Sequence, residues 1–209
     1  DGIIIGTGLE RYSSKFDIRH QFDERVNVQN SLNLSFVEQD GVLEGSGYFG
    51  NPALARNFLM PMQDPYNDDG SPAIFSGLHN PVYIQEYSID RKRNARIINS
   101  TNINVQLAPS LNFQTRFGID YLLSKEKYYD DRYHGDGDDD LGRVYDYVNN
   151  NSRITLLTNL THVYSINDKN TLTSSVFMNL QKNWFYSLQA GGLGFAADGL
   201  YNLTSTASP

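Results

Sequence analysis

Apolar and polar residues alternate along several stretches of the chain, and this period of two limits its fold more than any other feature. In the segment 26–36 the even-numbered residues are apolar, except Asn30, and the odd-numbered residues are polar. The segment 111–121 has apolar residues at most of its odd positions. A strand sends alternate side chains to opposite faces, whereas an amphipathic helix needs a period near 3.6. The sequence therefore predicts an all-β chain whose sheet has one apolar and one polar face.

Connections of two sizes join the alternating segments, and the two sizes themselves alternate along the chain. The long connections are rich in Gly, Pro, Asn and Asp and cover 43–92, 128–151 and the stretch from 187 onward. This arrangement predicts an antiparallel meander with short turns at one edge and long loops at the other. The expected strands are 3–22, 26–42, 93–107, 111–127, 152–165 and 171–187.

Side-chain parity predicts the register of the three hairpins. Paired residues of an antiparallel hairpin share a face, and a slip of one residue would invert that face. In the first hairpin both apolar sets are even-numbered, which centres its turn on Glu24 and places Tyr12 opposite Phe36. The same argument centres the other two turns on Pro109 and Asp168. Loops of three residues are therefore expected at all three turns.

Composition excludes several classes of protein. The 17 basic and 24 acidic residues give a net charge of −7, so no nucleic-acid partner is expected. The chain has no cysteine, which excludes disulfides, a thiolate metal site and a cysteine nucleophile. No stretch approaches the roughly 18 consecutive apolar residues of a membrane helix.

The length of the alternating segments favours a membrane barrel over a soluble sandwich. Strands of soluble sheets usually have about 5–6 residues, whereas a membrane-spanning strand needs about 9–11. Short turns at one edge, long loops at the other, a polar opposite face and aromatic residues near strand ends are typical of outer-membrane barrels. On this interpretation the polar face lines a lumen. The residues expected there are Lys15, Asp17, Arg19, Asn33, Arg116 and Asp120.

Short motifs along the whole chain resemble, as a set and in this order, one family. They are Asp1-Gly2-Ile3-Ile4-Ile5-Gly6-Thr7-Gly8, Glu10-Arg11-Tyr12-Ser13, Gly45-Ser46-Gly47, Asn51-Pro52-Ala53-Leu54-Ala55, Pro65-Tyr66, Asp69-Gly70-Ser71-Pro72, Gly118-Ile119-Asp120-Tyr121 and Asn159-Leu160-Thr161. The family is that of the SusC-like TonB-dependent outer-membrane transporters of Bacteroidota, and the resemblance is to the part of the barrel that follows the plug domain.

This resemblance implies a barrel of about 22 strands in the outer membrane of a Gram-negative bacterium, in contact with outer-membrane lipid. It also implies import of a glycan or peptide substrate, TonB acting through a plug, and a SusD-like lipoprotein as a lid. The plug and the TonB box are not expected within residues 1–209, and six strands cannot close such a barrel. The chain is therefore expected to be a section of the β-barrel domain.

The first long loop contains the candidate ligand-binding residues. Aromatic rings among amide side chains suit sugars or peptides, because stacking supplies contact area and amides supply direction. The competing interpretation, which we favour, is that the rings pack the loop against itself or against a lid. The candidates are Tyr48, Phe49, Phe58, Tyr66, Phe75 and Tyr83.

Charged clusters give weaker indications. Alternating carboxylates in the segment 130–140 suit calcium, but an EF-hand pattern is missing and a solvated acidic loop is the better interpretation. The run Arg91-Lys92-Arg93 is interpreted as an ordinary interfacial basic patch. A carboxylate pair such as Asp17 with Asp120 is a weak glycosidase candidate. No catalytic residue, metal site or cofactor is expected.

Two other hypotheses stay open. A passive porin-type barrel would have no energy coupling, and an upstream plug with a TonB box would exclude it. A soluble all-β glycan-binding module or hydrolase would make 1–209 a water-soluble monomer. A barrel section would instead require detergent, because an open sheet leaves its apolar face and two edges bare.

Overall fold

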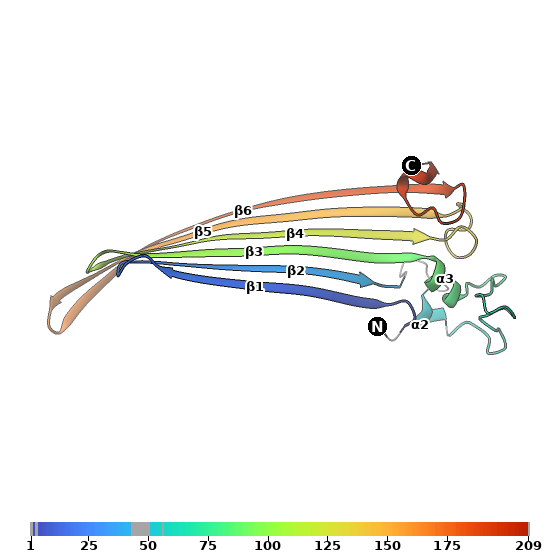
Figure 1. Ribbon diagram of the computed structural model, residues 1–209, viewed down its shortest axis with the longest axis horizontal. Helices are drawn as coiled ribbons and strands as arrows, with labels where there is room; N and C mark the ends of the chain where they lie inside the picture. Colours follow the sequence, from blue (N-terminus) through green and yellow to red (C-terminus); the bar gives the residue numbers. More distant parts are fainter. Residues whose placement is uncertain (1, 3, 43–50, 56, 209) are drawn as a thin grey trace.

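The computed structural model describes residues 2, 4–42, 51–55 and 57–208. They form one long, curved antiparallel sheet whose seven strands follow one another in chain order (Figure 1). The all-β meander predicted from the alternation is confirmed. The strands are β1 (Gly8–Gln21), β2 (Val26–Asp40), β3 (Ile89–Ala108), β4 (Leu111–Asp130), β5 (Arg143–Asn167), β6 (Asn170–Phe195) and β7 (Thr206–Ser208), with the helices α2 (Pro52–Ala55) and α3 (Pro81–Tyr87) and the 3₁₀ turn η1 (Leu203–Ser205).

The predicted register of the three hairpins is confirmed. Tyr12 lies opposite Phe36, and all β1–β2 partners are equidistant from Glu24. Along most of the β3–β4 and β5–β6 pairs the partners are equidistant from Pro109 and Asp168. Because a slip of one residue would turn every side chain to the opposite face, this register keeps the apolar side chains of neighbouring strands together.

The hairpin tips differ from the expected three-residue loops in two cases. In the first turn the Asp23 carboxylate accepts hydrogen bonds from the N–H groups of Arg25 and Val26, at 2.7 and 2.8 Å, and holds a three-residue loop. The other hairpins end in the two-residue tips Pro109-Ser110 and Asp168-Lys169, each beside a register shift of one residue. The expectation was wrong there because a bulge absorbs the extra residue and preserves the parity of the faces.

The cross-strand pairs give the sheet one apolar and one polar face. Large apolar side chains remain exposed on the first, for example 55% of Phe16 and 70% of Val176. Nothing in the described part of the chain therefore covers this face. One row across β2 to β6 on the apolar face is Val26, Val105, Phe113, Leu160 and Val176, and the adjacent row on the polar face begins with Asn27, Asn104, Gln114 and Asn159.

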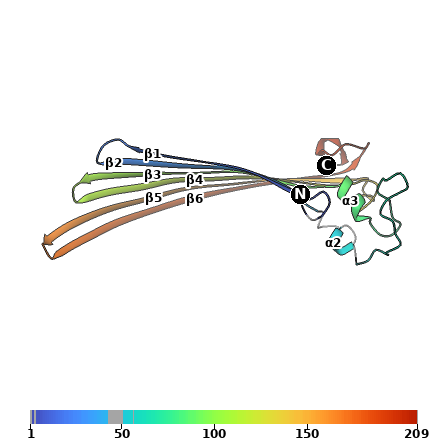
Figure 2. The ribbon, with the colours of Figure 1, turned by 60° about the horizontal axis from the view of Figure 1, so that its bottom comes forward.

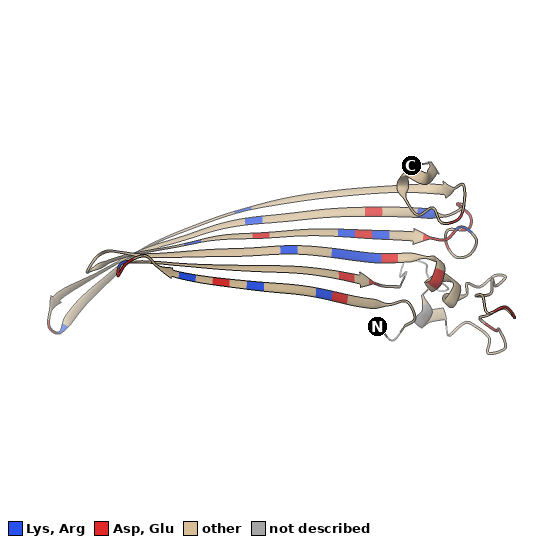
Figure 3. Ribbon diagram, in the orientation of Figure 1, with Lys and Arg blue, Asp and Glu red and all other residues tan. Residues whose placement is uncertain are grey.

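Charged residues gather toward the loop end of β2 to β5 (Figure 3). Toward the short turns, the segments 26–37, 97–108 and 154–167 contain no Asp, Glu, Lys or Arg. Each is at least as long as the roughly 9–11 residues that a tilted strand needs to cross a bilayer. In β2, β3 and β5 the part next to the short turns is thus free of charge, whereas β1 and β4 carry Lys15, Asp17, Arg19 and Arg116 at this level, all on the polar face.

Several strands end elsewhere than the alternation predicts. β1 begins at Gly8 rather than residue 3, because Thr7 N–H donates to Ile4 O at 3.1 Å and closes a turn. β3 and β5 begin earlier than expected, at Ile89 and Arg143, while β2 ends slightly earlier, at Asp40. β4 and β6 continue past 127 and 187, to Asp130 and Phe195. Backbone pairing continues at the loop end, where charged residues such as Lys127 and Asp146 interrupt the apolar face and alternation no longer marks a strand.

The short-turn edge of the sheet is stepped, because each hairpin reaches farther than the one before it (Figure 2). Val26, at the start of β2, lies opposite Val105, and β3 continues to Ala108. Leu111, at the start of β4, lies opposite His162, and β5 continues to Asn167. Such a stagger accompanies the tilt that strands need to close into a barrel.

Candidate functional site

The six polar residues expected to line a lumen lie on one face of the sheet. Lys15 lies opposite Asn33, Asn33 opposite Ile98 and Ile98 opposite Asp120, so this row crosses four strands. Asp17 and Arg19 follow Lys15 at alternate positions of β1, and Arg116 shares the face of Asp120 on β4. Whether this face lines a lumen stays a prediction.

Neighbouring polar groups occupy several of these side chains. Lys15 Nζ lies 3.0 Å from Asp17 Oδ2. Arg96 donates to both carboxylate oxygens of Asp120, at 2.9 and 2.7 Å. Asp17 and Asp120 themselves are separated by β2 and β3, or roughly 14 Å at the usual strand spacing. That exceeds the separation of a glycosidase carboxylate pair, so these two residues do not form one.

The basic run at the start of β3 is balanced by acidic residues on the neighbouring strands. Arg91 Nε donates to Asp40 Oδ1 at 2.6 Å, and Arg93 donates to both oxygens of Glu38 at 3.0 Å. Lys92 forms an ion pair with Glu126 on β4. Cross-strand ion pairs thus stabilise the loop-side half of the sheet, and the interpretation of this run as a basic patch needs this correction.

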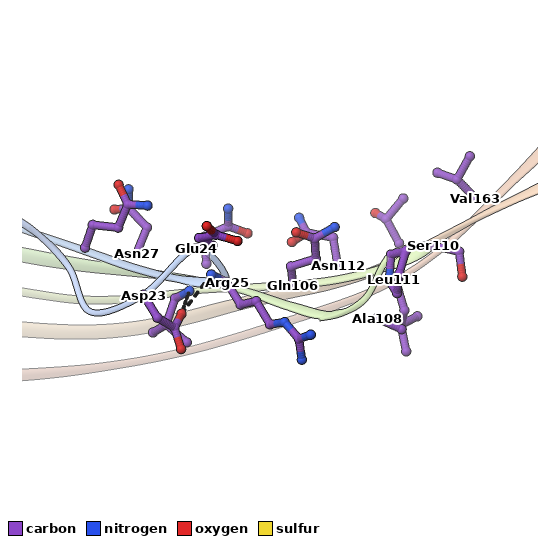
Figure 4. A pocket seen from close by; sticks show the side chains of 15 residues that line it. Asp23, Glu24, Arg25, Asn27, Gln106, Ala108, Ser110, Leu111, Asn112 and Val163 are labelled. Atoms are coloured by element: carbon purple, nitrogen blue, oxygen red, sulfur yellow. Dashed lines mark hydrogen bonds between the residues drawn. The ribbon is translucent and has the colours of Figure 1, made fainter.

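Two turns meet the polar face at the opposite edge of the sheet (Figure 4). A pocket of about 410 Å³ lies between the turns 23–25 and 108–110 and is lined by amide side chains such as Gln106 and Asn112. Asp23, which holds the first turn, and Arg25 also line it. The pocket is open to solvent. Its wall contains the hydrogen-bonded carboxylate of Asp23 but no cluster of nucleophilic side chains.

The packed core lies at the loop end of the molecule. Tyr129, Val144 and Phe195 are buried against one another at the loop ends of β4, β5 and β6. Ile89, Leu200 and Leu203 pack around this core from β3 and the C-terminal segment. Loops that connect different hairpins are therefore held together in one assembly.

Asn80 links separate parts of the first long loop to one another. Its side-chain nitrogen donates to Pro65 O and Ala73 O, both at 2.8 Å, and its side-chain oxygen accepts from Val82 N–H at 3.0 Å. The last bond caps the N-terminus of α3, where the first N–H groups of a helix have no internal partner. Asn80 is completely buried, so one residue orders two stretches of loop and a helix start.

The acidic segment 130–140 is a structural part of the assembly rather than a solvated loop. The side chain of Asp130 forms an ion pair with Arg143, and Asp131 and His134 are 7% and 3% exposed. Only part of the segment, including Asp138, is exposed. The sequence-based interpretation was wrong because carboxylates that pair with buried N–H, O–H and guanidinium groups look the same in a sequence as solvated ones.

Asp131 is a hydrogen-bond hub between this segment and α3. Its carboxylate accepts from Tyr83 Oη at 3.0 Å, from Tyr129 Oη at 3.4 Å and from Tyr133 N–H at 2.9 Å. Burial and the nearby carboxylate raise the pKa of the Tyr83 hydroxyl, so Tyr83 stays a donor. The hub joins the α3 helix to the end of β4.

His134 makes a second connection to the start of α3. Asn80 N–H donates to His134 Nε2 at 2.8 Å, which requires this imidazole nitrogen to be unprotonated. Burial, with a smaller effect of His79, lowers the pKa of His134. His79 Nδ1 lies 3.8 Å from Asp136, whose pKa burial raises.

A cavity of about 550 Å³ opens beside the Asp131 hub. We call it the tyrosine cavity, because five tyrosines from the first loop, the 129–133 segment and the C-terminal segment line it. Its walls also include the carboxylates of Asp131 and Asp198 and the polar side chains of Asn67 and Ser71. Aromatic rings with a few polar groups in a concave site are typical of ligand pockets. The tyrosines are Tyr83, Tyr87, Tyr129, Tyr133 and Tyr201.

The structure brings one of the six predicted ligand-binding aromatics into this cavity. Tyr83 lines it, whereas Phe58 and Tyr66 are exposed elsewhere on the loop and Phe75 is half-buried. Tyr48 and Phe49 lie outside the described residues. The ligand-binding role of these six residues stays a prediction.

Sequence reasoning did not connect Tyr129, Tyr133 and Tyr201 with the first loop. They lie on the end of β4 and on two loops that only the fold brings together, so sequence distance gave no indication. The tyrosines close to the acidic run in the segment 128–133 were the available signal.

Two further features are absent from the described residues. No group of three or more His, Cys, Asp or Glu residues there is placed to hold a metal ion. Among the described helices, none has the length and apolarity that crossing a membrane requires.

Comparisons with known proteins agree with the resemblance seen in the sequence motifs. No family model matches the chain. The TonB-dependent receptor P39 of Formosa agariphila is 24% identical over 221 residues, which cover 98% of this chain and 20% of that protein. This chain therefore spans about a fifth of the relative's length.

Solved structures share the fold. The structure of the RagAB peptide transporter matches with a TM-score of 0.77 and 14% identity, over 97% of this chain and 24% of that chain. The RagAB peptide importer matches with TM-scores of 0.77 in its closed-closed state and 0.75 in its open-open state. The sequence relative and the shared fold confirm that this chain resembles a barrel segment of a SusC-like TonB-dependent transporter.

Proposed function

We propose that residues 1–209 form part of the β-barrel of a TonB-dependent importer in the outer membrane of a Gram-negative bacterium. The observation that carries this proposal is the apolar face of the sheet, which is exposed in the described part of the chain, together with long segments of β2, β3 and β5 that contain no Asp, Glu, Lys or Arg. A lipid bilayer would cover such a face. The sequence relative is a TonB-dependent receptor, in keeping with this assignment.

The intact protein would import a peptide or glycan with a SusD-like lipoprotein as its lid. The RagAB structures, described as those of a peptide transporter, support the peptide alternative. The plug and the TonB box would lie in another part of the polypeptide, and the segment 1–209 would perform no chemistry. Its polar face would line the path of the substrate, and its loop assembly would face the exterior.

Single cysteines in the intact protein test which face meets lipid. The chain itself has no cysteine to remove. Phe113→Cys and Leu160→Cys lie on the apolar face, and their neighbours Gln114→Cys and Asn159→Cys are matched controls on the polar face. Spin labels at 113 and 160 should be accessible to oxygen but not to a nickel chelate in water, and labels at 114 and 159 should show the reverse.

The result separates the proposal from its alternatives. A soluble module would bury 113 and 160 in a protein core, and both labels would be inaccessible to both reagents. A passive porin would give the proposed labelling pattern, but its uptake of substrate would not depend on TonB. Equal accessibility of the two faces would contradict the barrel.

A further inference from the structure

The tyrosine cavity is acidic. Two carboxylates, Asp131 and Asp198, line it, and no Lys, Arg or His is among the described residues of its wall. Asp131 is nearly buried, whereas the side chain of Asp198 is 70% exposed at the rim. A partly enclosed site that is lined by negative charges attracts cations more strongly than an open surface does.

Hydrogen bonds inside the protein already occupy several donor groups of this wall. The hydroxyls of Tyr83 and Tyr129 donate to Asp131, and the side-chain nitrogen of Asn67 donates to Ser71 Oγ at 3.0 Å. Hydroxyl lone pairs, carboxylate oxygens and ring faces remain for a ligand. The cavity therefore offers acceptors and negative charge, which match a ligand group that only donates.

The protein's own chain shows which chemistry this rim accepts. The guanidinium carbon of Arg132 lies 5.1 Å from the centre of the Tyr133 ring, within the range of a cation–π interaction. Arg132 Nη1 also lies 3.7 Å from Asp198 Oδ1, longer than a hydrogen bond. A cation thus already rests between a tyrosine and a carboxylate at the rim, and its weak pairing leaves Asp198 open to water and ligand.

We propose that the tyrosine cavity binds a positively charged group of the imported substrate, an ammonium or guanidinium of a peptide. This inference rests on the proposed import function and narrows its substrate class. Several tyrosine rings and two carboxylates around a cavity of about 550 Å³ suit one such side chain with part of its peptide backbone. A neutral glycan would gain nothing from the negative charge.

Peptide binding to the intact transporter polypeptide tests the proposal. The probes are N-acetylated fluorescent pentapeptides that are identical except for a central lysine, arginine or norleucine, and a fourth norleucine peptide has a free amino terminus. The lysine and arginine peptides should bind about five- to tenfold more tightly than the acetylated norleucine peptide, and added salt should reduce the difference. Tight binding of the fourth peptide would assign the site to the amino terminus.

Two variants locate the effect. Asp198→Asn removes the exposed carboxylate, and Tyr201→Leu removes a ring that lines the cavity. Each should abolish most of the preference for the cationic peptides. Asp139→Asn makes the same charge change at an exposed residue outside the cavity wall and should leave the preference intact.

Equal binding of all four peptides, or a preference that both cavity variants retain, would overturn the cation inference. The importer proposal would then stand or fall separately on the accessibility of the labelled faces. Tight binding of a neutral oligosaccharide that Tyr201→Leu weakens would assign the cavity to a glycan and would also overturn the inference.

Discussion

At the residue scale, Asn80 is important for the structure of the first long loop, because both polar atoms of its side chain form hydrogen bonds inside the protein. Replacement by alanine would remove the side-chain donor to Pro65 O and Ala73 O, although Pro65 O would keep its bond from Ala73 N–H, and would remove the cap of α3. We expect Asn80→Ala to destabilise the loop assembly by about 2–4 kcal/mol. Hydrogen exchange of the segment 57–88 in the intact protein measures this change.

A serine at the same position separates the two roles. Asn80→Ser keeps an oxygen that can cap α3 but lacks the nitrogen that reaches the two carbonyl groups, so protection should be lost mainly in 65–73. Exchange in the β5–β6 hairpin should not change in either variant. Unchanged exchange of 65–73 in Asn80→Ala would show that the two carbonyl bonds do not hold the loop.

At the scale of elements, the His134 bond makes the attachment of α3 sensitive to pH. Because the folded-state pKa of His134 is lowered, the bond contributes stability that is complete above the ordinary histidine pKa, about 6.5, and is lost as pH falls from there toward the folded-state value. A protonated Nε2 would face the Asn80 N–H as a second donor. Proteolysis of the loop 57–80 should therefore accelerate as pH falls below about 6.5.

Several charged or titratable groups act on this equilibrium. Asp138 and Asp131 raise the pKa of His134 and so oppose the effect of burial, while His79 lowers this pKa. His134→Gln keeps an acceptor that does not titrate, so its proteolysis rate should vary much less with pH. A pH dependence that persists unchanged in this variant would assign the effect to another group, and Asp136 would be the first to test.

The elements also show what sequence reasoning can and cannot establish. The registers around Glu24, Pro109 and Asp168 were predictable. When the two faces of a sheet meet different solvents, a slip of one residue would put every side chain on the wrong face. The two-residue tips were not predictable, because a bulge keeps the apolar side chains on the same face and does not change the apolar pattern of the sequence. The helix α3 was missed because its seven residues are stabilised by Asn80 and the Asp131 hub rather than by an amphipathic period.

At the scale of the whole molecule, the sheet is an incomplete object. β1 has only β2 as a neighbour, and the outer edge of β6 pairs with β7 at two positions only, so long stretches of both edge strands lack a partner in the described part of the chain. Unpaired edges in a bilayer would be very costly, because no water reaches their N–H and C=O groups. The stagger of the hairpins and the one-sided apolar face therefore serve the same end, because both are needed for the sheet to continue into a closed barrel.

An arginine placed on either face tests this continuity in the intact protein. Leu160→Arg lies on the apolar face between Phe113 and Val176, within the charge-free segment 154–167. A charged residue toward lipid costs about 2–4 kcal/mol near the midplane of the bilayer and less near its surfaces. Asn159→Arg places the same charge one residue away on the polar face, where it can stay hydrated.

We therefore expect Leu160→Arg to reduce the amount of folded protein in the outer membrane, and Asn159→Arg to leave it nearly unchanged. The shift of the folded barrel in unheated gel electrophoresis, together with surface labelling of cells, measures both. Equal loss in the two variants would mean that the faces do not differ in solvent. A loss confined to Asn159→Arg would place lipid on the opposite face and would reverse the assignment of the lumen, although the pairing of the strands would remain the same.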